Sequence, residues 1–230
     1  MESTSPVTVP GRNVVIFQHV ANEPAGIFEE VLARNKVPFT YVKLYETDEV
    51  PDTDSASHLI FMGGPMSVND EQDLPWLRDE KALIRKSVAK NRPVLGICLG
   101  SQLIASAFGG RVYPFVTENG WRIIRRTGDG LLSGLPDSFR VFQLHGETFE
   151  IPPGGTLLCT GDAVRNQALS VGSATGLQFH LEPTRDLIAD WSQGVPAADR
   201  ERIAAETPLY LAESNRLAAT LAEKFLGLSR

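Results

Sequence analysis

The chain has 230 residues, of which 42% are hydrophobic and 22% charged, and its formal net charge is -6. This composition is typical of globular proteins and excludes disordered and collagen-like chains, while the acidic balance argues against a nucleic-acid partner. With two cysteines, no secretory signal in MESTSPVTVPGRN and no apolar run near ~18 residues, we expect a cytoplasmic protein with reduced thiols and no membrane partner.

The first half of the sequence alternates short apolar segments with segments of helical period. Strands are predicted at 13–19, 39–44, 58–62 and 93–97, and helices at 24–36, 73–90 and 98–108. Glycine pairs stop the third strand and the third helix, as turn and helix-end signals do. Strands that alternate with helices predict an α/β fold with a doubly wound, mostly parallel sheet flanked by helices.

The second half changes to short strands separated by turn residues. They are predicted at 111–113, 121–126, 139–144, 156–160, 168–171 and 176–181, and we expect several to be antiparallel and to extend the sheet. The chain is then predicted to be helical, with a long helix at 209–226. We expect a single domain at 13–230, with a C-terminal helical segment at 184–230 and a disordered lead-in at 1–12.

The first candidate site residue is Cys98, which lies between a predicted strand and a predicted helix and is flanked by Gly96 and Gly100. A sharp strand-to-helix turn exposes its central side chain and needs small flanking residues, as in a nucleophile elbow. The turn also places the thiol at a helix N-terminus, where backbone N–H groups favour anions. A free Cys outside such a setting is usually a small buried apolar residue, which is our interpretation of Cys159.

The second candidate is the pair His180 and Glu182 at the end of the predicted strand 176–181. Side chains alternate along a strand, so both are predicted to point to the same face. The carboxylate can then accept a hydrogen bond from the imidazole, fix its tautomer and stabilise the imidazolium after the ring takes a thiol proton.

Two further features follow predicted strands. The glycine turn after 58–62 lets backbone N–H groups approach a ligand closely, so Gly64 and Leu99 can both donate to an oxyanion. His19 also follows a predicted strand, where active-site residues of such sheets lie. Its role stays open between a site residue and a structural histidine.

Taken together, these segments resemble the class I glutamine amidotransferases, the Cys-His-Glu glutaminase domains. The resemblance is carried by MGGP at 62–65, GICLGSQ at 96–102, HGE at 145–147 and GLQFHLE at 176–182. It extends from about residue 14 to about residue 183 and is nearest to the glutaminase part of GMP synthetase and its free-standing relatives. It implies the flavodoxin-like fold of that family, with an antiparallel extension.

The resemblance also implies roles for individual residues. Cys98 corresponds to the nucleophile, His180 to the general base and acid, and Glu182 to the carboxylate that orients it. The remaining implied residues surround the substrate: Gly64 and Leu99 in the oxyanion hole, and Gln102, Gly146 and Glu147 in contact with the glutamine. Family members often carry Asp at the position of Glu147. The resemblance implies no metal and no other cofactor.

The implied reaction is hydrolysis of the γ-amide of glutamine, or of a related γ-glutamyl compound, through a γ-glutamyl thioester. The segment after residue 183 is too short for a synthase half, and no GxxxxGK[ST] phosphate-binding motif occurs. Three hypotheses follow. In the first, the protein is a glutaminase and passes ammonia to a separate synthase subunit. In the second it is a self-sufficient γ-glutamyl peptidase with the same triad, and in the third it is a non-enzymatic binding relative.

Overall fold

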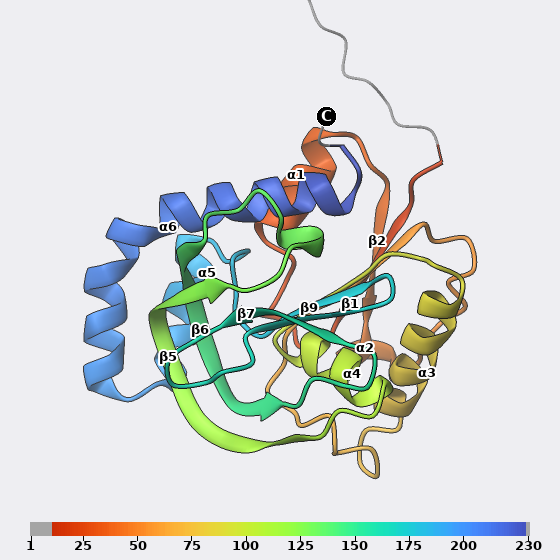
Figure 1. Cartoon of the computed structure of the whole chain (residues 1–230), viewed down its shortest axis with the longest axis horizontal. Coiled ribbons are helices and arrows are strands. Elements are labelled where there is room, and N and C mark those ends of the chain that lie inside the picture. Colours follow the sequence, from red (N-terminus) through yellow and green to blue (C-terminus); the bar gives the residue numbers. More distant parts are fainter. Residues whose placement is uncertain (1–10, 229–230) are drawn as a thin grey trace, which may run out of the picture.

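Short apolar segments from both halves of the chain form a nine-stranded sheet in a computed structural model that describes residues 11–228 (Figure 1). The strands are β1 (Val14–Gln18), β2 (Phe39–Lys43), β3 (His58–Phe61), β4 (Val94–Ile97), β5 (Val112–Arg126), β6 (Ser138–Phe149), β7 (Thr156–Thr160), β8 (Ala168–Val171) and β9 (Ala174–Leu177). The α-helices are α1 (Ile27–Arg34), α2 (Leu44–Thr47), α3 (Trp76–Ala89), α4 (Leu99–Ala107), α5 (Arg185–Trp191) and α6 (Ala197–Phe225). Two short 3-10 helices, η1 (Gly130–Leu132) and η2 (Ser192–Gly194), complete the elements.

The strand order is β2-β1-β3-β4-β9-β8-β7-β5-β6. Strands β2, β1, β3, β4 and β9 are parallel to their neighbours, whereas β9-β8, β8-β7, β7-β5 and β5-β6 pair antiparallel. The predicted fold class, a doubly wound parallel sheet with an antiparallel extension, is therefore confirmed.

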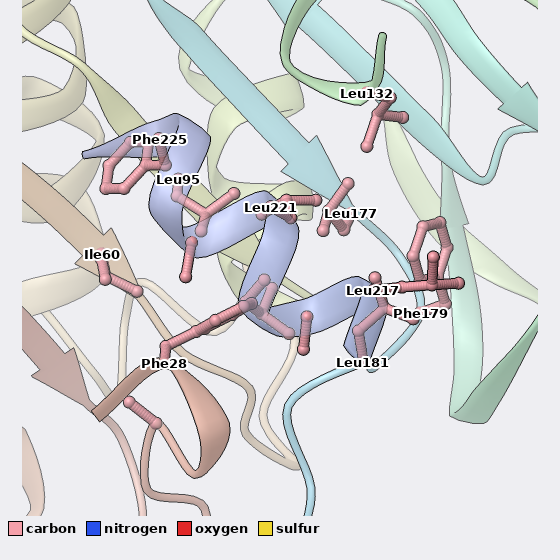
Figure 2. Close-up of a cluster of buried hydrophobic side chains, with 14 of the residues drawn as sticks. Phe28, Ile60, Leu95, Leu132, Leu177, Phe179, Leu181, Leu217, Leu221 and Phe225 are labelled. Atoms are coloured by element: carbon pink, nitrogen blue, oxygen red, sulfur yellow. The ribbon is translucent and has the colours of Figure 1, made fainter. Parts of the chain in front are cut away.

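Apolar helix faces cover both sides of the parallel strands. Residues of β1 alternate between them: Ile16 belongs to the cluster under α1 and α6, and Phe17 to the cluster under α3 and α4. Figure 2 shows the first cluster, in which Phe28 of α1 and Leu221 of α6 lie over the sheet. Each such buried side chain contributes about 1.5–3 kcal/mol relative to exposure, so the two layers hold the strand ends in place.

The structure differs from the sequence predictions in the antiparallel region. The strands predicted at 111–113 and 121–126 are one strand, β5, whose pairing with β6 is irregular between Pro114 and Glu118. Proline has no N–H to donate to the ladder, so it interrupts the pattern locally without ending the strand. Strand β6 runs further than the predicted 139–144 because β5 provides a partner along that length.

The C-terminal helix also starts earlier than predicted. Helix α6 covers 29 residues and contains Pro208, where the prediction at 209–226 began. Proline removes one helical hydrogen bond and bends a helix without always ending it. Figure 1 shows that α6 changes direction along its length, so that it packs first on the β5–β6 ribbon and then across α1.

The ends of the chain lie outside the central sheet. Of the predicted lead-in at 1–12, residues 1–10 lie outside the described residues, and Arg12 donates a hydrogen bond to the carbonyl of Gly227 over 3.1 Å. Among the described residues, every helix is too short or too polar to span a membrane.

The carboxyl ends of the parallel strands meet at one edge of the sheet. His19 follows β1, Gly63 follows β3, Cys98 follows β4, and the segment 178–182 follows β9. The order β2-β1-β3 makes the gap between β1 and β3 the point where the chain reverses direction across the sheet. Ligands bind at such points in open α/β sheets, so this edge is where a site is expected.

Candidate active site

Cys98 sits in a strained turn between β4 and α4. It is the N-cap residue of α4 and has a φ of 49°, which L-residues rarely adopt. A Cβ on Gly96 would collide with the carbonyl of Gly100, and a Cβ on Gly100 would collide with the carbonyl of Phe61. Both glycines are therefore required for α4 to start so close to β3 and β4, which is the geometry expected of a nucleophile elbow.

The Cys98 thiol lies in the wall of a cavity of about 790 Å³. Its Sγ is 3.9 Å from the carbonyl oxygen of Leu144 and 3.8 Å from Nε2 of Gln178. The residue is 6% exposed, so the thiol reaches the cavity while most of its surface is packed. A molecule in this cavity can therefore approach Sγ from one side only.

His180 and Glu182 form a buried pair beside this thiol. Nδ1 of His180 donates to Oε1 of Glu182 over 2.6 Å, and the N–H of Leu181 donates to Oε2 over 3.0 Å. Burial alone would lower the pKa of His180, but the Glu182 charge and hydrogen bonds to Cys98 and Glu182 raise that pKa well above its usual value. The ring therefore holds a proton at neutral pH, next to the sulfur.

The prediction that strand alternation aligns this pair is wrong. Strand β9 ends at Leu177, because its partner β4 ends at Ile97. The chain then crosses to β6, where His180 exchanges two backbone hydrogen bonds with Phe142, of 3.1 and 2.8 Å. This isolated bridge aims the imidazole at Glu182, and the ring of Trp191 covers it with a centroid distance of 5.0 Å.

Gly64 and Leu99 face each other across the glycine turn. A Cβ on Gly64 would lie 3.1 Å from Cδ2 of Leu99, so the two residues are in contact. Within residues 11–228 neither of their N–H groups donates to a protein acceptor. The Leu99 N–H also opens α4, where the helix dipole favours negative charge. The two N–H groups are thus available to an anion beside Cys98.

The other predicted substrate residues lie around the same cavity. Gln102, Gly146 and Glu147 all line it. The Gln102 amide donates to Gln178 over 3.3 Å, and the Glu147 carboxylate accepts from Ser67 over 3.1 Å. Burial raises the pKa of Glu147, and the charge of Asp70 adds to this, against the Ser67 hydrogen bond. One side of the cavity is therefore acidic and suited to a cationic group.

Two charged residues close to the site carried no sequence signal that we recognised. Glu23 belongs to the loop between β1 and α1, and its Oε2 occupies the space that a Cβ on Gly63 would need. Burial raises the pKa of Glu23, and the charges of His180, Glu182 and His19 also act on it. Glu80, on α3, contacts His19 deep behind the glycine turn. Both contacts join segments far apart in the chain, so no local pattern could reveal them.

The remaining thiol lies away from the cavity. Cys159 on β7 is completely buried in the apolar cluster under α6, which agrees with its interpretation as a core residue. Burial raises the pKa of Cys159 to about 12. Among residues 11–228, no group of three or more His, Cys, Asp or Glu side chains is placed to hold a metal ion.

Comparisons with known proteins identify relatives over most of the chain. The sequence profile of glutamine amidotransferase class-I matches residues 27–187. A solved glutamine amidotransferase from Methylobacillus flagellatus has 31% identity and a TM-score of 0.85, covering 95% of this chain and 96% of that one.

Curated relatives share part of their length with this chain. A glutamine-hydrolysing GMP synthase of Thermomicrobium roseum is 37% identical over 56% of this chain, which matches 24% of that protein. A glutamine-hydrolysing GMP synthase subunit of Thermococcus kodakarensis is 34% identical over 54% of this chain and 65% of its own length. The profile match covers more than half of the sequence, and the resemblance drawn from its motifs is confirmed. The chain belongs to the class I glutamine amidotransferase family of enzymes.

Proposed function

We propose that this protein hydrolyses the γ-amide of glutamine to glutamate and ammonia through a covalent γ-glutamyl intermediate. The observation that supports this most directly is one juxtaposition. A thiol on an elbow, a buried His–Glu pair and two unpaired N–H groups meet at the wall of one cavity within the described residues. Each part is needed for acyl transfer from an amide, and a binding protein would need none of them together.

In the first step, the Cys98 thiolate attacks the γ-carbonyl carbon of the substrate. The carbonyl oxygen takes the electron pair and is stabilised by the N–H groups of Gly64 and Leu99. Nδ1 of His180 is engaged by Glu182, so its Nε2 faces the reacting atoms and gives its proton to the departing nitrogen. The C–N bond breaks, ammonia leaves, and a thioester with Cys98 remains.

In the second step, water replaces ammonia. Nε2 of His180, now neutral, takes a proton from the water as it attacks the thioester carbonyl. The same two N–H groups stabilise the second oxyanion. The C–S bond breaks, glutamate is released, and the imidazolium–thiolate pair is restored. Glu182 stabilises the charged ring in both steps and remains a carboxylate throughout.

The acidic side of the cavity provides for the other end of the substrate. We assign the α-ammonium group to the side lined by Glu147, and the amino acid backbone to Gly146 and Gln102. Charge complementarity supports this, because the Glu147 carboxylate has a hydroxyl, not a cation, as its hydrogen-bond partner.

The ammonia would then be passed to a separate synthase subunit. The chain spans 24% of the Thermomicrobium roseum relative that it matches, and that relative is named as a GMP synthase. We therefore propose a partner chain as the acceptor, with glutamine hydrolysis slow in its absence. A thiol nucleophile needs a reducing compartment, which favours the cytoplasm.

A second candidate function is the hydrolysis of larger γ-glutamyl amides without any partner. The cavity of about 790 Å³ supports it, because that volume is in the range that holds drug-sized ligands and exceeds what one amino acid fills. The same triad would act, and the leaving group would be the amine of a peptide or of another γ-linked compound.

One assay separates these functions. The purified protein is offered glutamine and a series of γ-glutamyl dipeptides, and release of ammonia and of free amine is followed. Preference for dipeptides supports the second candidate, and slow release of ammonia supports a glutaminase that needs a partner. Replacement Cys98→Ala should abolish both reactions, whereas Cys159→Ala should retain them. No turnover of either substrate by the wild-type protein would reject both functions.

A further inference from the structure

His19 and Glu80 form a fully buried pair directly behind the glycine turn. Nδ1 of His19 is 3.0 Å from the carbonyl oxygen of Gly63, and Nε2 is 3.0 and 3.3 Å from the two oxygens of Glu80. Both side chains are 0% exposed. A carbonyl oxygen can only accept, so Nδ1 carries a hydrogen and donates it to Gly63.

The pair links three elements that are distant in the sequence. His19 follows β1, Gly63 follows β3, and Glu80 lies on α3. The ring of Trp76 packs on the imidazole with a centroid distance of 5.5 Å, which limits its rotation. A buried polar contact of this kind has to be satisfied on both sides, and here both ring nitrogens have partners.

The turn is also confined on its other side. A Cβ on Gly63 would collide with the Glu23 carboxylate and would lie 3.3 Å from Cε1 of His180. The peptide group that joins Gly63 to Gly64 is therefore held between His19 and His180. It has little freedom to rotate, and its orientation is set by the hydrogen bond to Gly63.

We propose that His19, held by Glu80, positions and polarises this peptide group so that the Gly64 N–H is a stronger donor to the oxyanion. This inference rests on the proposed function. His19 is thus a positioning residue that acts through one peptide bond and has no contact with the substrate.

Peptide geometry supports the positioning. In a planar trans peptide the C=O and N–H bonds point in opposite directions, and no cis peptide bond occurs among the described residues. Drawing the Gly63 carbonyl toward His19 therefore turns the Gly64 N–H away from it, on the residue that lines the cavity beside Cys98.

Electrostatics supports the polarisation. Burial alone would lower the pKa of His19, but the charge and hydrogen bond of Glu80 raise it, and the Glu23 charge adds to this. Burial also raises the pKa of Glu80, against His19 and Lys81, so one proton is shared along the Nε2–Glu80 hydrogen bond. A positively charged donor on a carbonyl withdraws electrons from the amide and strengthens its N–H as a donor.

The test compares variants of the pair in γ-glutamyl hydrolysis. Glu80→Gln keeps the shape but removes the charge, and we expect kcat to fall about 10-fold with KM unchanged. His19→Leu removes the donor, and kcat should fall about 100-fold, the size expected when one oxyanion donor is lost. His19→Asn, whose amide can replace the Nδ1 donor, should recover part of the loss. His58→Asn, a buried histidine at the other end of β3, is the matched control and should keep the wild-type kcat.

Alkylation of Cys98 by iodoacetamide distinguishes this role from a merely structural one. That displacement forms no oxyanion, so its rate should be equal in the wild type, Glu80→Gln and His19→Asn. If kcat is unchanged in Glu80→Gln and His19→Leu, or if alkylation slows in parallel with kcat, the inference is wrong. Glu80→Gln is nearly isosteric, so it keeps the test valid even if His19→Leu does not fold.

A spectroscopic measurement separates this inference from the proposed function. The amide proton of Gly64 should resonate further upfield in Glu80→Gln than in the wild type, because its peptide group is less polarised. If the wild-type protein hydrolyses neither substrate but this shift occurs, the proposed function fails and the polarisation holds. If the wild-type protein is active and the Gly64 resonance does not move, the polarisation is refuted.

Discussion

Replacing Glu182 by Gln tests the electrostatic part of the site. The substitution keeps the size of the side chain and an oxygen for the Leu181 N–H, but removes the charge that lies 2.6 Å from Nδ1 of His180. The imidazolium then loses its counter-charge in a buried environment. We expect acylation to slow, because the proton for the leaving nitrogen comes from this ring.

The magnitude follows from the geometry. Two unit charges about 4 Å apart attract each other by roughly 4 kcal/mol at an effective dielectric constant near 20, which is an upper limit. Charge-assisted hydrogen bonds contribute about 1.5–3 kcal/mol net, and a neutral one of the same shape about 1 kcal/mol. The difference is on the order of 1–2 kcal/mol, so kcat/KM should fall roughly 5- to 30-fold.

The assay is the pH dependence of γ-glutamyl anilide hydrolysis. Since Glu182 raises the pKa of His180, the protonated ring persists to higher pH in the wild type. In Glu182→Gln the alkaline limb of the profile should therefore move to lower pH. Glu223→Gln, an exposed carboxylate paired with Arg34, is the control and should change neither rate nor profile. A Glu182→Gln profile that moves to higher pH, or does not move, would refute this account of the pair.

Three other expectations concern the thiols and the core. Iodoacetamide at neutral pH should label Cys98 and spare Cys159, whose pKa is raised to about 12 by burial; peptide mass mapping checks this, and labelling of native Cys159 would contradict it. Gly100→Ala should destabilise the fold by about 1–3 kcal/mol in thermal unfolding, because its Cβ meets the Phe61 carbonyl, whereas Gly194→Ala, with open space, should not. Leu221→Ala should cost about 2–5 kcal/mol of unfolding free energy and leave the kcat of the folded protein unchanged; a loss below about 1 kcal/mol would show that the core under α6 is loosely packed.

The parallel half of the fold could be predicted from the sequence because its rules are local. Apolar runs that end in glycine, followed by helical periodicity, define each βα unit without reference to the rest of the chain. The elbow at Cys98 could be predicted for the same reason, since Gly96 and Gly100 belong to one short segment. The strand predicted at 156–160 coincides with β7.

What the sequence did not reveal depends on contacts between distant segments. The path of His180 is set by its bridge to Phe142 on β6, so the alternation rule does not hold for residues that have already left β9. The surroundings of His19 are set by Glu80, which is 61 positions away along the chain. Long-range hydrogen bonds of this kind follow from the packed tertiary structure, and no periodicity in the sequence reports them.

The central claim, that Cys98 is acylated by a γ-glutamyl group, is tested most directly by intact-protein mass spectrometry. The protein is mixed with a γ-glutamyl substrate, quenched in acid within the first turnovers, and digested for peptide mapping. We predict an adduct of one γ-glutamyl group on the peptide that contains Cys98. It should be present in Cys159→Ala and absent in Cys98→Ala. Hydrolysis that proceeds without this adduct in Cys98→Ala, or an adduct on Cys159, would contradict the account.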